Sequence, residues 1–196
     1  MASTEWDDHD GERRVRADLM TVISSRACSP TDALRAALDL PNAWWTELRR
    51  SVDTIAATTT TRYADRPARA GKRVAKVFGH AAAEAFRPAE FETTHGDLHW
   101  SNVVGPEFGI LDWELWGPGP AGVDAATLYL FSLLMPETSK RVHQTFGDVL
   151  DSSAGQAAQV SVASRILARA DEGENLDLAD AVRTYIAPIL DGRLRR

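Results

Sequence analysis

Residues 95–112 read HGDLHWSNVVGPEFGILD, and this stretch decides how the rest of the chain is interpreted. Its histidines, aspartates and asparagine are side chains that can do chemistry. They alternate with apolar residues of the kind that form short buried strands. Such a concentration of polar groups among buried strands predicts a functional site.

The spacing of Asp97 and Asn102 is D-x-x-x-x-N, which is the spacing in the catalytic loop of phosphoryl-transfer enzymes. In that loop the aspartate orients the proton of an attacking hydroxyl, and the asparagine turns back to hold a magnesium ion. The alternative for both residues is a turn or a helix cap, because Asp and Asn favour such positions. We interpret both as residues of the site.

The residues after Asn102 predict a β-hairpin. Residues 103–104 are apolar, residues 105–107 (GPE) favour a turn, and residues 108–111 are again largely apolar. The hairpin would return the chain and place Asp112 beside Asn102. An unpaired carboxylate buried in a strand is costly, and carboxylate and amide oxygens suit Mg²⁺. Asp112 is therefore predicted to be the second metal ligand.

The combined pattern H-G-D-L-H-x-x-N, followed by L-D-W-E at residues 111–114, resembles the aminoglycoside phosphotransferase family, whose fold is like that of the protein kinases. The resemblance implies ATP as the phosphoryl donor and Mg²⁺ as the cofactor. It implies that Asp97 is the catalytic residue and that Asn102 and Asp112 are the magnesium ligands. His95 is similar to the histidine that buttresses this loop.

Three further polar residues are expected to support the site. The resemblance gives Asp124, which follows the glycine- and proline-rich residues 117–122, a mainly structural role at the start of the next helix. His99 has no assigned role, and histidines in such positions are more often structural. Glu114 either lines the site or is a solvated loop carboxylate.

The resemblance also implies the fold class, which is mainly α with a small β-hairpin, like the helical C-terminal lobe of the protein-kinase-like fold. A complete kinase-like enzyme needs a second lobe, with a small sheet, a phosphate-covering loop and a lysine. No Gly-rich loop precedes the motif, and Lys72 and Lys76 fall on a predicted helix. We expect a flexible arm over residues 1–11 and the C-terminal lobe over residues 12–196, with the N-terminal β lobe absent.

Composition narrows the classes of partner. The 196 residues, 44% of them hydrophobic, can bury one sizeable core. A net charge of −6 argues against nucleic acid or an anionic membrane as the partner. The single cysteine, Cys28, excludes an intramolecular disulfide, and no apolar run is long enough to span a membrane. We expect a cytoplasmic protein with a small-molecule substrate, and with an N-lobe-bearing partner or a second copy of the chain.

Hydrophobic periodicity, capping residues and prolines predict the helices. The expected ranges are 12–27, 29–40, 41–57, 65–86, 121–135, 137–151, 155–171 and 177–190. A short strand is expected over residues 91–94, leading into the motif. The range 121–135 is strongly apolar and is expected to be the central helix of the core.

Three functions follow from these patterns. The first is an ATP- and Mg²⁺-dependent phosphotransferase, in which acidic residues of the helical lobe receive a cationic or polyhydroxylated, aminoglycoside-like acceptor. The second is a non-catalytic remnant or ligand-binding module, because ATP without the second lobe loses its adenine pocket and its lysine. The third is a metal-dependent hydrolase in which His95, Asp97 and His99, at alternate positions of a strand, bind zinc or manganese.

Overall fold

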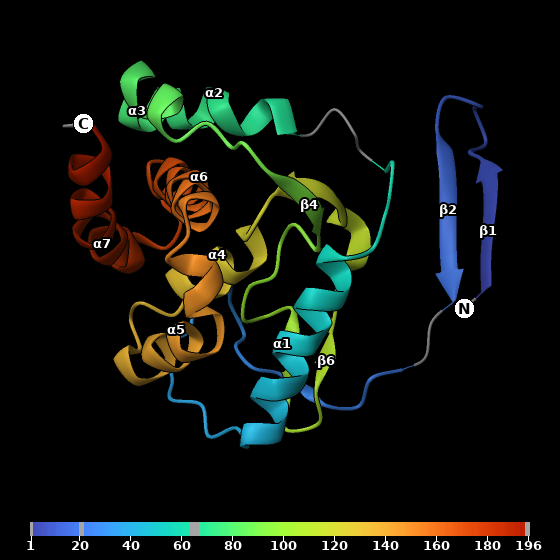
Figure 1. Ribbon diagram of the computed structural model, residues 1–196. Helices are drawn as coiled ribbons and strands as arrows, with labels where there is room; N and C mark the ends of the chain where they lie inside the picture. The colour runs from blue at the N-terminus through green and yellow to red at the C-terminus, as the bar shows by residue number, and fades with distance from the viewer. Residues whose placement is uncertain (1, 20–21, 63–66, 195–196) are drawn as a thin grey trace.

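The computed structural model describes residues 2–19, 22–62 and 67–194, and these form a mainly helical structure with short antiparallel strands (Figure 1). The elements, in chain order, are β1 Ala2–Asp7, β2 Arg14–Leu19, β3 Arg26–Ala27, α1 Asn42–Ala56, α2 Pro67–Phe78, α3 His80–Ala85, β4 Phe91–Thr94, β5 Val103–Gly105, β6 Gly109–Ile110, the 3₁₀ helix η1 Trp113–Leu115, β7 Gly117–Pro120, α4 Val123–Leu130, α5 Pro136–Leu150, α6 Ser153–Ala170 and α7 Leu176–Leu194. None of the described helices is both long and apolar enough to cross a membrane.

Helix α6 is the centre of the helical part, where it packs against α2, α4, α5 and α7. Its buried positions are mostly small or β-branched residues, among them Ala157, Ala158 and Ala163. Small side chains let neighbouring helices approach closely, whereas the largest buried groups, Trp100 and Phe131, come from the segments around it. The expectation that residues 121–135 form the central helix is therefore only partly right. That segment is buried, but its helix α4 ends at Leu130.

The two short sheets around the motif hold it in place. Strands β5 and β6 form the predicted hairpin, with Val103 opposite Ile110, and β3 adds to the other edge of β5. Helix α1 packs beside this sheet, where the indole nitrogen of Trp44 donates to the carbonyl of Val104 at 2.8 Å. The predicted strand β4 pairs antiparallel with β7. Strand β7 was not predicted, because its sequence GPGP has two prolines that cannot donate to a ladder.

The N-terminal prediction is wrong. The sequence predicted a flexible arm up to residue 11 and a helix from residue 12, but β1 and β2 form an antiparallel hairpin. Residues 14–19 alternate polar and apolar side chains, which is the period of a strand. The guanidinium of Arg14 pairs with Glu5 across the hairpin at 2.9 Å. The expected helical stripe extended through residues 20–21, which lie outside the described residues.

Two other predicted helices differ from the structure. The range 29–40 contains no helix, because Ser29, the expected N-cap, is buried and donates its hydroxyl to the carbonyl of Ala33 at 3.0 Å. The range 65–86 is divided into α2 and α3 by Gly79, whose φ of 89° is not helical. Residues 65–66 of that range lie outside the described residues. The helices α1, α5, α6 and α7 agree with the prediction to within a few residues.

The junction of α5 and α6 gives a test of the fold. A Cβ at Gly155 would lie 1.9 Å from the carbonyl oxygen of Val149, whereas a Cβ at Gly192 in α7 would meet nothing within 4 Å. We expect Gly155→Ala to lower the free energy of unfolding by roughly 2 kcal/mol or more, because backbone must move. We expect Gly192→Ala to leave it unchanged or raise it by up to about 1 kcal/mol.

Urea unfolding followed by circular dichroism measures both glycine variants. Gly192→Ala is the matched control, since it makes the same substitution in a helix with open space. Equal stabilities of the two variants would contradict the packing described for the α5–α6 junction.

Candidate functional site

The loop that carries Asp97 is fixed by Asp124 in the first turn of α4. Its two carboxylate oxygens accept the backbone N–H groups of His95 at 2.6 Å and of Gly96 at 3.0 Å. Burial raises the pKa of Asp124, and these two hydrogen bonds oppose the rise by stabilising the charged form. A buried carboxylate that holds two N–H groups is a strong structural anchor. This geometry matches the structural role expected for Asp124.

His95 connects this loop to the β5–β6 hairpin. Its ring is fully buried, and Nε2 lies 2.8 Å from the carbonyl oxygen of Leu111, the residue before Asp112. The backbone N–H of Asp97 points at His95 Nδ1 over 3.4 Å. Both contacts are satisfied by one neutral tautomer, with the proton on Nε2. His95 therefore holds the two ends of the motif together, as a buttressing histidine must.

Asp97 lies among positive groups. Its Oδ1 is 3.0 Å from Nη1 of Arg165, and its Oδ2 is 3.3 Å from Nε2 of His99. His99 also contacts Asp32 at 3.4 Å, and Asp32 pairs with Arg169 at 3.1 Å. Burial alone would raise the pKa of Asp97, but the hydrogen bond from His99 and the charges of Arg165 and Arg169 outweigh it and lower the pKa to about 2. The carboxylate is therefore ionised at neutral pH.

The backbone pairing of the hairpin brings Asn102 and Asp112 close together at its open end. The side-chain nitrogen of Asn102 donates to the carbonyl of Asp97 at 2.9 Å, so its amide oxygen is the end left for a metal. The backbone N–H of Leu111 donates to the carbonyl of Asn102 at 2.8 Å, which places Asp112 next to this pair. Asp112 has a left-handed backbone with φ 59°. Its side chain is exposed, so the prediction of a carboxylate buried in a strand is wrong.

One amide oxygen and one exposed carboxylate are the donor types that Mg²⁺ prefers. Mg²⁺ is commonly held by one or two carboxylates, with substrate phosphates and water completing its octahedron. Within the described residues no group of three or more His, Cys, Asp and Glu side chains could hold a metal ion. The two donors at the hairpin are therefore of types that fit a magnesium ion whose remaining ligands come from outside the chain.

The zinc or manganese site suggested by His95, Asp97 and His99 is contradicted by the geometry. Strand β4 ends at Thr94, so these three residues do not alternate along a strand. Both ring nitrogens of His95 face backbone partners, as described above. His99 is instead a structural residue, since its Nδ1 contacts the hydroxyl of Ser101 at 3.0 Å and its Nε2 faces two aspartates.

Glu114 lies on η1 and is exposed, and it is not among the residues that line the cavity beside Asp97. Its backbone carbonyl accepts a hydrogen bond from the guanidinium of Arg62 at 2.8 Å. Of the two alternatives left open by the sequence, the structure favours the solvated carboxylate.

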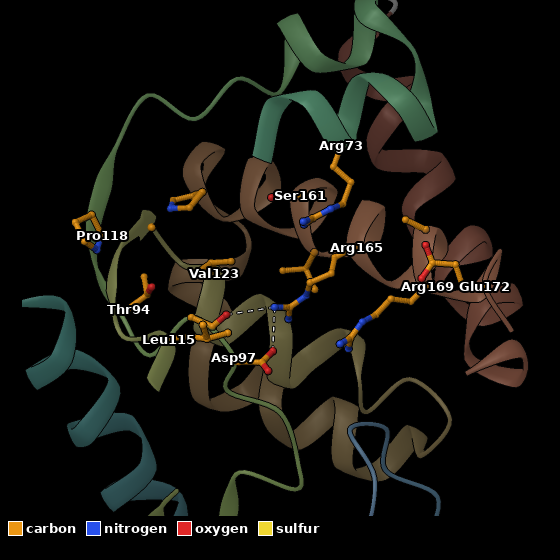
Figure 2. A pocket seen from close by; sticks show the side chains of 15 residues that line it. Arg73, Thr94, Asp97, Leu115, Pro118, Val123, Ser161, Arg165, Arg169 and Glu172 are labelled. Carbon is orange, nitrogen blue, oxygen red and sulfur yellow. Dashed lines mark hydrogen bonds and ion pairs between the residues drawn. The ribbon is translucent and has the colours of Figure 1, made fainter. Parts of the chain in front are cut away.

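A cavity of about 510 Å³ lies beside Asp97, between α2, α6 and β7 (Figure 2). One of its main residues, Arg165, was not predicted from the sequence, and it donates hydrogen bonds to both Asp97 and the carbonyl of Gly96. The available signal was a charged residue among the small, apolar and uncharged polar residues 157–167 of a predicted helix. Pockets for small molecules commonly have volumes of about 300–1,000 Å³, so this cavity is large enough for one.

The electrostatics of Asp97 predict how stability depends on pH. Its pKa of about 2 lies below the ordinary value of 3.8. The ionised carboxylate therefore stabilises the folded state above about pH 4, and this contribution is lost as the pH falls toward 2. By linkage the whole contribution is about 2 kcal/mol, of which roughly 1 kcal/mol disappears between about pH 5 and pH 3.

Urea unfolding at several pH values tests this expectation, with Asp97→Asn as the reference that has no titrating group at residue 97. The free energy of unfolding of the wild type should fall more steeply toward low pH than that of the variant. Parallel curves would show that the neighbours of Asp97 do not hold it ionised.

Comparison with known proteins agrees with this geometry. The model of the phosphotransferase enzyme family matches residues 31–159, which is more than half of the chain and includes the whole motif and Asp124. No curated protein and no solved structure matches the chain. Because the matched range covers the loop, the hairpin and the helix that anchors them, the chain belongs to the phosphotransferase enzyme family.

Proposed function

We propose that the protein transfers the terminal phosphoryl group of ATP, with Mg²⁺, to a hydroxyl group of a small polar molecule. One observation carries this proposal: Asp97, held ionised by its neighbours, lines a cavity on one side and is hydrogen-bonded through its backbone to Asn102 on the other. A small molecule in the cavity could present its hydroxyl to this carboxylate. Family membership supports the same class of reaction.

Each side chain has a role in this mechanism. Asp97 accepts a hydrogen bond from the acceptor hydroxyl and directs its oxygen at the phosphorus atom. Its low pKa suits orientation better than full removal of the proton early in the reaction. Asn102 and Asp112 hold Mg²⁺, which when bound neutralises charge on the phosphate oxygens. His95 and Asp124 hold the loop and the hairpin that carry these groups in fixed positions.

We also propose that the described residues correspond to the helical, C-terminal lobe of a kinase-like fold. In support, the lysines Lys72 and Lys76 lie on helix α2 rather than on a strand. The β1–β2 hairpin lies at the opposite edge of the molecule from α7 and is acidic at its turn (Figure 1). An N-lobe would then complete the nucleotide-binding site. That lobe would belong to a partner chain or to another segment of a longer protein. A cytoplasmic location remains a prediction from the sequence.

A non-catalytic binding module is the second candidate, and two contacts of Asp97 favour it. Both carboxylate oxygens of Asp97 already have a partner, Oδ1 in Arg165 and Oδ2 in His99. A carboxylate oxygen can accept more than one hydrogen bond, so these contacts still leave room for a hydroxyl. The transfer experiment below decides between the two candidates.

The first test is transfer of radiolabelled phosphate from ATP to a panel of polyols, amino sugars and hydroxy acids, with Mg²⁺ and a supplied N-lobe. We expect Asp97→Asn to lower kcat by about 10²–10⁴-fold, because the hydroxyl loses its orienting base. Asp39→Asn makes the same change at an exposed site and should retain wild-type activity. If the wild type transfers no phosphate to any acceptor, the binding module is the correct function.

The second test concerns the metal. Asp112→Asn should raise the Mg²⁺ concentration needed for half-maximal activity by at least about tenfold, because an anionic ligand becomes neutral. Glu107→Gln, in the exposed turn of the same hairpin, is the matched control and should leave that concentration unchanged. Identical Mg²⁺ dependence of the wild type and Asp112→Asn would remove Asp112 from the metal site.

A further inference from the structure

The cavity beside Asp97 is lined by more positive than negative side chains. Arg73 enters it from α2, and Arg165 and Arg169 enter it from α6, whereas the acidic residues of its lining are Asp97 and Glu172 (Figure 2). The chain as a whole carries a net charge of −6. This cavity therefore has a local charge opposite in sign to that of the whole chain.

The positive charge of the cavity is only partly compensated. Arg169 pairs with Asp32 at 3.1 Å and with Glu174 at 3.5 Å, and Arg165 pairs with Asp97. The Nε of Arg165 is buried and is the one such side-chain atom in the described part of the chain without a hydrogen-bond partner. A buried donor of this kind costs free energy unless a ligand satisfies it.

Arg73 is half-buried, and no acidic partner for it is found among the described residues. Burial and the neighbouring charge of Arg169 both lower the pKa of Arg73. Burial also lowers the pKa of Arg165; Asp97 opposes this effect, and Arg169 and Arg73 add to it. Guanidinium groups that repel one another in a partly buried space favour an anion between them.

The cavity reaches Asp97 but not the proposed magnesium ligands. Asp97 and Gly96 belong to its lining, whereas Asn102 and Asp112, the proposed magnesium ligands, do not. In phosphoryl transfer the aspartate accepts a hydrogen bond from the incoming hydroxyl, whose oxygen lies in line with the phosphorus atom of the metal-bound phosphate. A molecule in the cavity would therefore reach Asp97 without contacting the proposed magnesium ligands.

We infer that the acceptor carries an anionic group, a carboxylate or a phosphate, and that Arg73 and Arg165 bind this group while Asp97 receives the hydroxyl. Guanidinium groups suit this task because they match planar anions with paired hydrogen bonds. The inference rests on the proposed function and specifies its substrate class. It replaces the cationic, aminoglycoside-like acceptor expected from the sequence, since a cation would meet three arginines in this cavity.

Calorimetric titration of inorganic phosphate into the full chain, without ATP or Mg²⁺, tests the anion site directly. We expect binding at one site per chain, weakened at least tenfold by Arg73→Met. Lys72→Met is the matched control, because it removes one positive charge from the exposed residue that directly precedes Arg73 on α2. It should change the Kd by less than twofold. Arg73 is chosen because its half-buried side chain pairs with no described acidic residue, so its loss should not unfold the protein.

Competition between inorganic phosphate and MgATP shows whether the anion site belongs to the acceptor or to the nucleotide. If MgATP displaces inorganic phosphate and itself binds at least tenfold more weakly to Arg73→Met, the site belongs to the nucleotide and the inference is wrong. The inference is also wrong if phosphate does not bind, or if Arg73→Met and Lys72→Met weaken it equally. Independent binding of phosphate and MgATP is the supporting result.

The transfer assay separates this inference from the proposed function. Hydroxy acids or phosphorylated alcohols should be phosphorylated by the wild type, and Arg73→Met should raise their KM at least tenfold with a smaller change in kcat. Transfer to cationic acceptors alone, unaffected by Arg73→Met, would overturn the anionic acceptor and leave the phosphotransferase intact. Phosphate binding without transfer to any acceptor would overturn the phosphotransferase and with it the acceptor class.

Discussion

The site depends on one constraint: a buried carboxylate accepts hydrogen bonds from two backbone N–H groups. Asp124 holds the N–H groups of His95 and Gly96, which fixes where the chain turns after β4. Helix α4 carries Asp124 and packs against α5 and α6. The hydrogen bonds to Asp124 therefore hold the loop in a fixed position relative to the helical core. A loop without such an anchor would present Asp97 in many orientations, and orientation is most of what phosphoryl transfer requires of a protein.

A few hydrogen bonds from His95 and Asn102 join the loop to the hairpin. His95 reaches the carbonyl of Leu111, and Asn102 exchanges backbone and side-chain contacts with both ends of the motif. The proposed metal ligand Asp112 is thereby positioned by its neighbours, although its own side chain is exposed. The hydrogen bond from His99, together with Arg165 and Arg169 of α6, then keeps Asp97 ionised. The motif thus positions the central carboxylate, and His99 of the same motif acts with two arginines of α6 to keep it ionised.

The charge of the cavity shows why composition is a poor guide to a binding site. The acidic residues that give the chain its net charge of −6 are spread over the surface, and several of them form ion pairs there. Arginines far apart in the sequence, on α2 and α6, converge on one space instead. The charge that a substrate meets depends on which side chains line the same low-dielectric pocket. The net charge of the sequence does not contain that information.

The sequence by itself determined the motif, because its spacing is local: Asp97, Asn102 and the hairpin to Asp112 lie within one short segment whose turns and strands follow from nearby residues. It also determined the long helices α1, α5, α6 and α7, whose apolar periodicity extends over several turns. Tertiary structure alone decided that Arg165 pairs with Asp97, that GPGP becomes a strand beside β4, and that the N-terminal segment is a hairpin. These outcomes depend on contacts between residues distant in the sequence, or on the choice between two periodicities that the same residues satisfy, and only packing resolves them.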